Sequence, residues 1–362
     1  MTNSVLYRLP GETSVCHYVE NADKDIIVVQ SVADIPDGNV FVFAPFVASA
    51  ETPIVVFNMQ GVRDVSIDSL AAQNVLSDFS SHESNTTVNA SRQTYTNDFS
   101  VFHEALEQER FSKLVLSRSA AVQLNAAPDY IELFIEASRQ NPNCFVALVS
   151  TAIAGTWLMA TPEILLEQKG QSYHTVALAG TQKQTACFVE ANGQKFLWNG
   201  KNKNEQQLVA QYIRGRLDAK NIPYRESGPA TVKAGQLLHL RSDFVFSRED
   251  CRLSVPQMLE WLHPTPAVCG LPADEAKTFI IEHEHNKREY YSGFCGVIDE
   301  TGGGTHVYVT LRCMKIAERQ CTLYAGGGLL TDSVEADEWN ETQNKMQAML
   351  RLLAPYVEGQ RD

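Results

Sequence analysis

Short apolar segments separated by polar turns are the feature that most limits how this chain can fold. Runs such as Ile26–Val29, Val40–Phe46 and Ile54–Phe57 have the length of buried strands. Longer segments with helical spacing, among them 205–219 and 335–353, stand apart from these runs. Strand runs punctuated by separate helices predict an α+β fold and not a repeated strand–helix–strand architecture.

The remaining elements follow the same patterns. Further strands are expected at 113–122, 144–150, 156–160, 164–168, 173–179, 293–299, 305–316 and 321–325, and further helices at 98–109, 128–139 and 274–288. Asp98 and Pro128 are expected to open two of these helices. The segment from Ser77 to Asn97 follows the first strands and precedes these helices. It is polar and poor in large apolar residues, which indicates an exposed connector.

Charge and composition exclude several classes of protein. The formal net charge of -13 disfavours a nucleic-acid or anionic-membrane binder, although local cations could still bind an anionic substrate. No apolar stretch approaches about 18 residues, and the first residues lack the pattern of a secretion signal. The eight cysteines form no CxxC pair and are expected to be free, buried thiols in a reducing cytoplasm.

Three charged residues occupy positions where a core is expected. Glu205 borders the apolar face of its helix, unless it is a first-turn glutamate favoured by the helix dipole. Lys113 shares a strand face with Val115, and a lysine in a dry cleft can act as a base; the alternative is an edge-strand lysine. Glu163 precedes an apolar strand and could equally be a surface carboxylate.

The last helix carries a second group of charges. Glu338, Glu341 and Lys345 share one face, and a glycine run at 326–328 precedes them. Between a strand and a helix, such a run would let backbone N–H groups approach an anion, although it could also be a simple turn. Carboxylates from two helices suit Mg²⁺. A zinc site at His283 and His285 is not expected, because their spacing on a helix points them to different sides.

Several segments in order resemble the chorismate-utilising enzymes, which include isochorismate, salicylate, anthranilate and aminodeoxychorismate synthases. The matching segments are KLVLSR at 113–118, ATPEILL at 160–166, ALAGT at 177–181, HPTPAVCG at 263–270, REYYSGFCG at 288–296, TLR at 310–312 and EWNETQNK at 338–345. The family's K-D-R-x-E-H segment reads KNKNEQ at 201–206, which keeps the leading lysine and Glu205.

The resemblance implies a fold and a set of roles. It implies large antiparallel sheets packed as a sandwich with helices outside, in one catalytic domain over 1–362, with a variable part at 1–97 and a core at 98–355. Lys113 would activate water and Glu163 would protonate the leaving hydroxyl. A Mg²⁺ ion would be held by Glu205, Glu338 and Glu341. The implied substrate-binding residues are Gly180, Thr181, Ala267, Tyr291, Arg312, Gly327, Gly328 and Lys345.

Within the family, the sequence favours isochorismate synthase, an isomerase that acts on chorismate. The block at 263–276 differs from the P-x-x-S-x-T-G-A-P-K of anthranilate and aminodeoxychorismate synthases, and Ala267 stands where salicylate synthases tend to carry threonine. A salicylate synthase and a catalytically inactive chorismate-binding relative stay open as alternatives. We expect a cytoplasmic monomer that serves menaquinone or siderophore biosynthesis.

Overall fold

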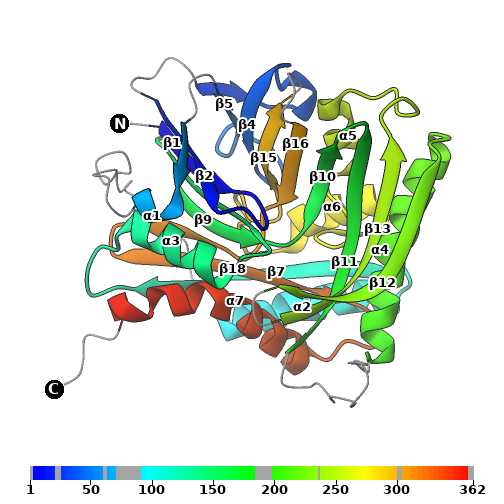
Figure 1. The fold of residues 1–362 in the computed structure, drawn as a ribbon. Coiled ribbons are helices and arrows are strands. Elements are labelled where there is room, and N and C mark those ends of the chain that lie inside the picture. Colours follow the sequence, from blue (N-terminus) through cyan, green and yellow to red (C-terminus); the bar gives the residue numbers. More distant parts are fainter. Residues whose placement is uncertain are drawn as a thin grey trace, which may run out of the picture.

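The computed structural model describes residues 3–20, 26–59, 63–70, 91–183, 198–234, 237–299 and 304–357. Two antiparallel sheets of nine strands each face one another, and helices cover their outer faces (Figure 1). The α+β sandwich predicted from the sequence is therefore confirmed. No helix in the described ranges is long and apolar enough to cross a bilayer.

The first sheet is assembled from distant parts of the chain. Its strands are β1 (Asn3–Arg8), β2 (Ser14–Glu20), β6 (Arg63–Ser66), β7 (Lys113–Gln123), β8 (Phe145–Thr151), β9 (Gly155–Thr161), β14 (Gly270–Leu271), β17 (Cys313–Ala317) and β18 (Gln320–Leu329). They lie in the order β14–β7–β18–β17–β9–β8–β1–β2–β6. Thus β7, which begins at Lys113, is an interior strand of this sheet and not an edge strand.

The second sheet lies opposite the first. Its strands are β3 (Ile26–Val29), β4 (Asn39–Ala44), β5 (Ile54–Asn58), β10 (Ile164–Lys169), β11 (Ser172–Lys183), β12 (Tyr224–Ala234), β13 (Leu237–Ser247), β15 (Phe294–Asp299) and β16 (Gly304–Val309). They lie in the order β12–β13–β11–β10–β16–β15–β4–β5–β3. The expected early strands at 26–29, 40–46 and 54–57 are confirmed, with small differences at their ends.

Helices complete the layers on both outer faces. They are η1 (Val32–Asp34), α1 (Ile67–Leu70), α2 (Arg92–Glu107), α3 (Tyr130–Gln140), α4 (Gly200–Ala219), α5 (Val255–Leu262), α6 (Ala273–His283) and α7 (Glu335–Val357). Val209, Ile213 and Leu217 of α4 belong to the core that covers the second sheet, whereas Met346 and Met349 of α7 belong to that of the first. Each such side chain contributes about 1.5–3 kcal/mol when fully buried.

The start of α2 differs from the prediction. The helix begins at Arg92, where the Ser91 hydroxyl accepts a hydrogen bond from the Thr94 amide, so Arg92–Asn97 are helical and not part of a connector. Asp98 is not a cap. It is buried inside the helix, and its carboxylate accepts hydrogen bonds from the His285 backbone and ring. Residues 77–90 of the predicted connector lie outside the described residues.

A second correction concerns the expected strand at 305–316. The chain leaves the second sheet after Val309 and enters the first at Cys313, so this segment is two strands in different sheets. Arg312 lies at the crossing with a φ of 46°, a backbone conformation that is uncommon outside glycine. The crossing places Arg312 between the sheets.

Other helix ends also differ from the prediction. α3 begins at Tyr130 with Asp129 as its cap, and α4 begins at Gly200, five residues before Glu205. Glu205 is therefore not a first-turn residue. α6 ends at His283, so His285 lies beyond the helix. Of the eight cysteines, six are described with their side chains, and all six are buried and free, as the sequence predicted.

Candidate active site

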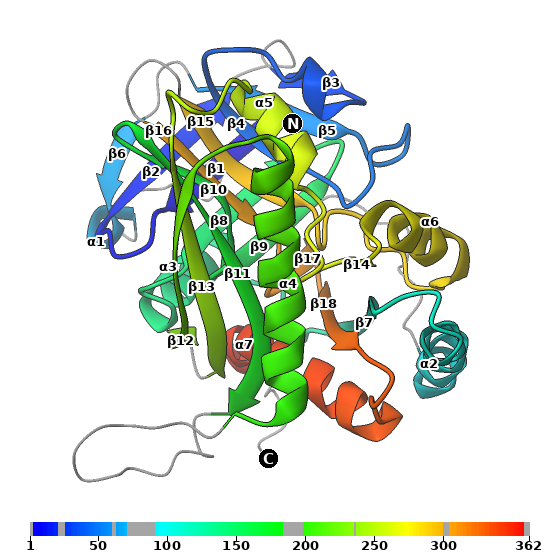
Figure 2. The ribbon, with the colours of Figure 1, turned by 90° about the vertical axis from the view of Figure 1, so that its right-hand side faces the viewer.

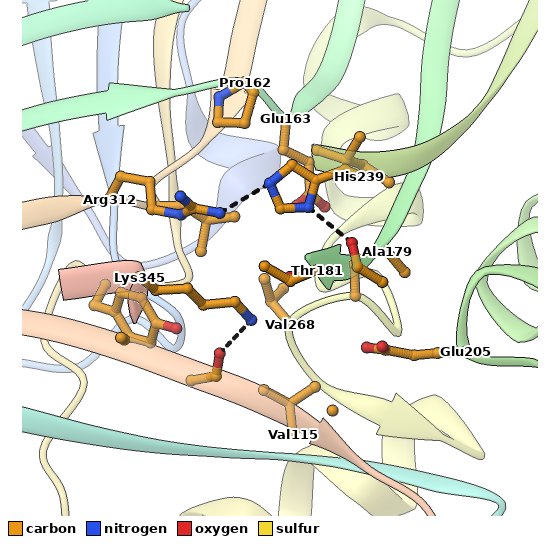
Figure 3. A pocket seen from close by; sticks show the side chains of 18 of the residues that line it. Val115, Pro162, Glu163, Ala179, Thr181, Glu205, His239, Val268, Arg312 and Lys345 are labelled. Carbon is orange, nitrogen blue, oxygen red and sulfur yellow. Dashed lines mark hydrogen bonds between the residues drawn. The ribbon is translucent and has the colours of Figure 1, made fainter. Parts of the chain in front are cut away.

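A cavity lies where β7 and β18 of the first sheet face β11 and β13 of the second. Its walls come from both sheets, from α4 and α7, and from the turns between strands. The lining residues are Val115, Pro162, Glu163, Leu178, Ala179, Gly180, Thr181, Glu205, His239, Ala267, Val268, Tyr291, Leu311, Arg312, Tyr324, Ala325, Gly326, Gly328 and Lys345. Figure 3 shows Glu163 at one end and Val115 at the other, with Glu205 and Lys345 between them.

The structure brings the predicted site residues together. Those that do not line the cavity are Lys113, Gly327, Glu338 and Glu341. Lys113 and Glu341 pair with the lining residues Glu205 and Lys345, and Gly327 lies between the lining residues Gly326 and Gly328. Glu338 lies against Gly327. Residues separated by more than 200 positions in the sequence therefore converge on one small volume between the sheets.

Lys113, which lies behind the cavity wall, forms a buried ion pair with the lining residue Glu205. The Lys113 side chain is fully buried, and its Nζ lies 3.1 Å from Oε1 of Glu205. Burial alone would raise the pKa of Glu205, but the ammonium groups of Lys113, Lys345 and Lys201 outweigh it and lower that pKa. Glu205 is therefore an ionised carboxylate in the interior.

The glycine run, which was expected between a strand and a helix, is part of a strand. Gly326 to Gly328 belong to β18 and pair with Ser117, Leu116 and Val115 of β7. A Cβ atom on Gly327 would lie 3.1 Å from Oε2 of Glu338 and 3.8 Å from Oε1 of Glu341, and one on Gly328 would lie 2.7 Å from Cε of Lys113. Because glycine has no side chain, the strand leaves room for these charged groups.

Each carboxylate behind the glycine run contacts a lysine. Lys345 donates to the Gly326 carbonyl at 2.7 Å and forms an ion pair with Glu341, also at 2.7 Å. Lys201 forms an ion pair with Oε1 of Glu338. The other Glu338 oxygen, Oε2, is buried and has no hydrogen-bond partner among the described residues. Burial, reinforced by the charge of Glu341, raises the pKa of Glu338, although Lys201 opposes the shift.

Glu163 occupies a different electrostatic environment. Glu163 lies just after the end of β9, and the residue is 4% exposed. Burial raises the pKa of Glu163 to about 7, although the charges of Lys113, Lys345 and Arg312 oppose this shift. A carboxyl group with such a pKa can hold a proton at neutral pH and deliver it to a leaving group.

Arg312 is held by a residue that the sequence did not single out. Its Nη2 donates to Nε2 of His239 at 3.0 Å, and Nδ1–H of His239 donates to the Gly180 carbonyl at 2.9 Å (Figure 3). Burial, together with the charge of Arg312, lowers the pKa of His239 well below its usual value. The neutral imidazole therefore accepts from Arg312 and fixes the direction of the guanidinium. Sequence reasoning also gave Lys201 no role in the site.

Gly180 makes the backbone of β11 irregular next to the cavity. Its φ is 73°, and the pairing of β11 with β13 shifts register between Ala179 and Gln182. A side chain at Gly180 would lie 3.1 Å from Cβ of Asn202 on α4. The irregularity turns the Gly180 carbonyl toward His239 and places Thr181 on the cavity wall.

The carboxylates can be tested for their fit to a metal. Within the described part of the chain, no three acidic, histidine or cysteine side chains are arranged as a formed metal centre. However, Glu205, Glu338 and Glu341 all border the Gly327–Gly328 segment, and Glu338 carries a buried oxygen without a partner. Hard oxygen donors of this kind fit Mg²⁺ once the lysine ammonium groups no longer contact these carboxylates.

Comparisons with known proteins agree with this geometry. Residues 23–354 match the family described as chorismate binding enzyme. Isochorismate synthase EntC of Escherichia coli is 33% identical over 246 residues, which cover 66% of this chain and 62% of EntC. Isochorismate synthase DhbC of Bacillus subtilis is 32% identical over 252 residues, which cover 67% of this chain and 63% of DhbC. The matched region thus spans less than two thirds of these relatives.

Solved structures show the same fold over almost the whole chain. MenF, the menaquinone-specific isochorismate synthase from Escherichia coli, superposes with a TM-score of 0.73 at 21% identity, covering 97% of this chain and 88% of MenF. Anthranilate synthase component I from Streptococcus pneumoniae gives a TM-score of 0.66 at 15% identity. With the family match over residues 23–354, the chain belongs to the chorismate binding enzyme family.

Proposed function

We propose that this protein is an isochorismate synthase, which adds water at C2 of chorismate while the C4 hydroxyl leaves. The observation that carries the proposal is the contrast between Glu163 and Glu205 in one cavity. The pKa of Glu163 is raised to about 7 by burial, whereas that of Glu205 is lowered by lysines. Two carboxyl groups with opposite protonation at neutral pH suit acid catalysis beside a charged binding group.

The proposed roles follow from the positions of the side chains. Lys113, once its ammonium has released a proton, would take the proton of the water that adds at C2. Glu163 would give its proton to the C4 hydroxyl, which leaves as water. Arg312, fixed by His239, would bind a carboxylate of the substrate, with Tyr291 beside it on the cavity wall. Gly180, Thr181, Ala267 and Lys345 would line the rest of the substrate site.

We propose Mg²⁺ as the cofactor. Glu205 and Glu341 would hold it, with Glu338 as a further ligand or as a support through water. Bound Mg²⁺ would neutralise and orient the ring carboxylate of the substrate. In this proposal Glu338 is kept close by Lys201, whose ammonium it contacts.

Incubation of the purified protein with chorismate and MgCl₂ tests the function directly. Isochorismate as the sole product is expected. Salicylate with pyruvate would instead identify a salicylate synthase, and unchanged chorismate would identify an inactive relative. We further propose a cytoplasmic monomer that supplies menaquinone or siderophore biosynthesis; light scattering of the purified protein tests the oligomeric state.

Two variants test the assigned roles. Lys113→Ala should abolish water addition in a protein that still folds, and normal turnover would remove Lys113 from this role. Glu341→Ala should weaken Mg²⁺ binding in calorimetry and lose metal-dependent activity. Unchanged Mg²⁺ affinity and activity would refute the ligand assignment, whereas an exposed substitution such as Glu249→Gln should change neither.

A further inference from the structure

A second cavity lies apart from the candidate active site, over the outer face of the second sheet. Its volume is about 360 Å³, within the range of small-molecule sites, roughly 300–1,000 Å³. The end of β4 and the loop after it form one wall, and α4, α5 and α6 form the other. Figure 2 shows the upper end of α4, α5 and the β4–β5 region gathered at one end of the molecule.

His263 lines this cavity with its imidazole ring. Its ring packs edge-on against Phe46 and Phe294, with centroids 6.4 and 5.1 Å away. Burial, followed by the charge of Lys277, lowers the pKa of His263 to about 3, although the backbone of Phe46 opposes the shift. The ring is therefore neutral. Both ring nitrogens are buried and neither has a hydrogen-bond partner among the described residues; a neutral imidazole has one nitrogen that accepts, and this nitrogen calls for a donor.

Two cations stand on the same walls. Lys277 is half-buried and makes no ion pair with any described residue. Arg216 is also half-buried. Its Nε and Nη2 donate to the Trp261 carbonyl at 3.0 and 2.5 Å, and its guanidinium lies over the Tyr212 and Trp261 rings. The carboxylates of Glu260 and Asp274 line the cavity at exposed positions, where water screens their charge.

We propose that this second cavity binds a small carboxylic acid that also carries a hydroxyl group. The carboxylate would meet Lys277 and Arg216, and the hydroxyl would donate to the accepting nitrogen of His263. Apolar side chains of the wall, among them Ile54 and Phe294, would enclose the carbon skeleton. The inference is independent of the proposed function, because none of these residues lines the first cavity.

One segment separates the two cavities, so the experiment must tell them apart. His263 and Pro264 line the second cavity, whereas Ala267 and Val268 line the first. Both cavities also present an arginine that could attract a carboxylate. Variants of both are therefore needed, together with a lysine variant that touches neither. Lys220, exposed at the end of α4, is such a control because it carries the same charge as Lys277.

Calorimetric titration with 4-hydroxybenzoate, benzoate and 4-hydroxybenzyl alcohol tests the proposal. The first probe should bind the wild-type protein more tightly than the other two. Lys277→Gln should weaken it about tenfold, the effect of losing one charged hydrogen bond. His263→Phe should keep the ring packing and lower the affinity of 4-hydroxybenzoate to that of benzoate. Lys220→Gln and Arg312→Ala should leave binding unchanged.

Three results would overturn the proposal. The first is the absence of binding to the wild-type protein. The second is an affinity that neither Lys277→Gln nor His263→Phe alters. The third is loss of binding in Arg312→Ala, which would place the probe in the first cavity. Circular dichroism of each variant, compared with the wild type, shows whether a loss of binding follows from a loss of fold.

Discussion

Replacing Glu163 with glutamine should change how the stability of the protein depends on pH. The pKa of Glu163 rises from an ordinary 4.5 to about 7 in the folded state, mainly because the carboxyl is buried. Below pH 4.5 both folded and unfolded states hold the proton, so the group has no effect on the difference between them. Between pH 4.5 and 7 the unfolded state releases the proton while the folded state keeps it.

The sign and size follow from this difference. Because the folded state binds more protons in this window, the free energy of unfolding falls as pH rises. The shift corresponds to about 3 kcal/mol, fully lost above pH 7. Glutamine keeps the shape but cannot ionise. Glu163→Gln should therefore become more stable relative to the wild type by about 3 kcal/mol between pH 4.5 and pH 8.

Urea unfolding at pH 4.5, 6 and 8 measures this difference. Glu249→Gln, at an exposed position, serves as the matched control and should show a flat difference. A stability difference for Glu163→Gln that does not change with pH would refute the raised pKa, and with it the role of Glu163 as a proton donor. In turnover assays the same variant should be inactive, and wild-type activity should fall as pH rises above about 7.

Four further substitutions test other parts of the site and fold. Gly328→Ala should destabilise the protein by about 1–3 kcal/mol in urea unfolding, because its Cβ would lie 2.7 Å from a lysine side chain. Gly215→Ala, in open space on α4, should instead stabilise the protein by about 0.5–1 kcal/mol. His239→Phe removes the acceptor of Arg312 and should raise KM for chorismate about tenfold in steady-state assays. Hydrogen bonds from histidines and a tyrosine outweigh burial and lower the pKa of Glu167. Glu167→Gln should therefore lower the free energy of unfolding at pH 7. This difference from the wild type should shrink as pH falls below the usual carboxyl range in unfolding experiments.

Local patterns predicted the charged residues of the site well. Lys113 alternates with Val115 along one strand, and Glu205 precedes Val209 by one helical turn, so a position facing the core was one of two interpretations for each. The structure buries both and pairs them at 3.1 Å. Periodicity succeeds here because the direction of a side chain follows from its neighbours along the chain.

Features that depend on partners in space were predicted less well. The glycine run was expected after the end of a strand, but β7 supplies a strand partner for all three glycines. Arg312 looked like the middle of one strand because 305–316 is apolar on both sides of it. The break at Thr310–Arg312 follows from two sheets that compete for the segment, and nothing local records that competition.

His239 shows the limit most clearly. It stands among leucines, in Leu237–Leu240, and such a histidine reads as an ordinary strand residue. Its function depends on Gly180, which lies 59 positions away across the β11–β13 pair, and on Arg312, which lies 73 positions away at the crossing between the sheets. One polar residue that faces inward on an apolar strand must find partners, because burying it unpaired costs free energy. The sequence shows a polar residue that needs partners in the interior, and only the pairing of the strands shows which residues those partners are.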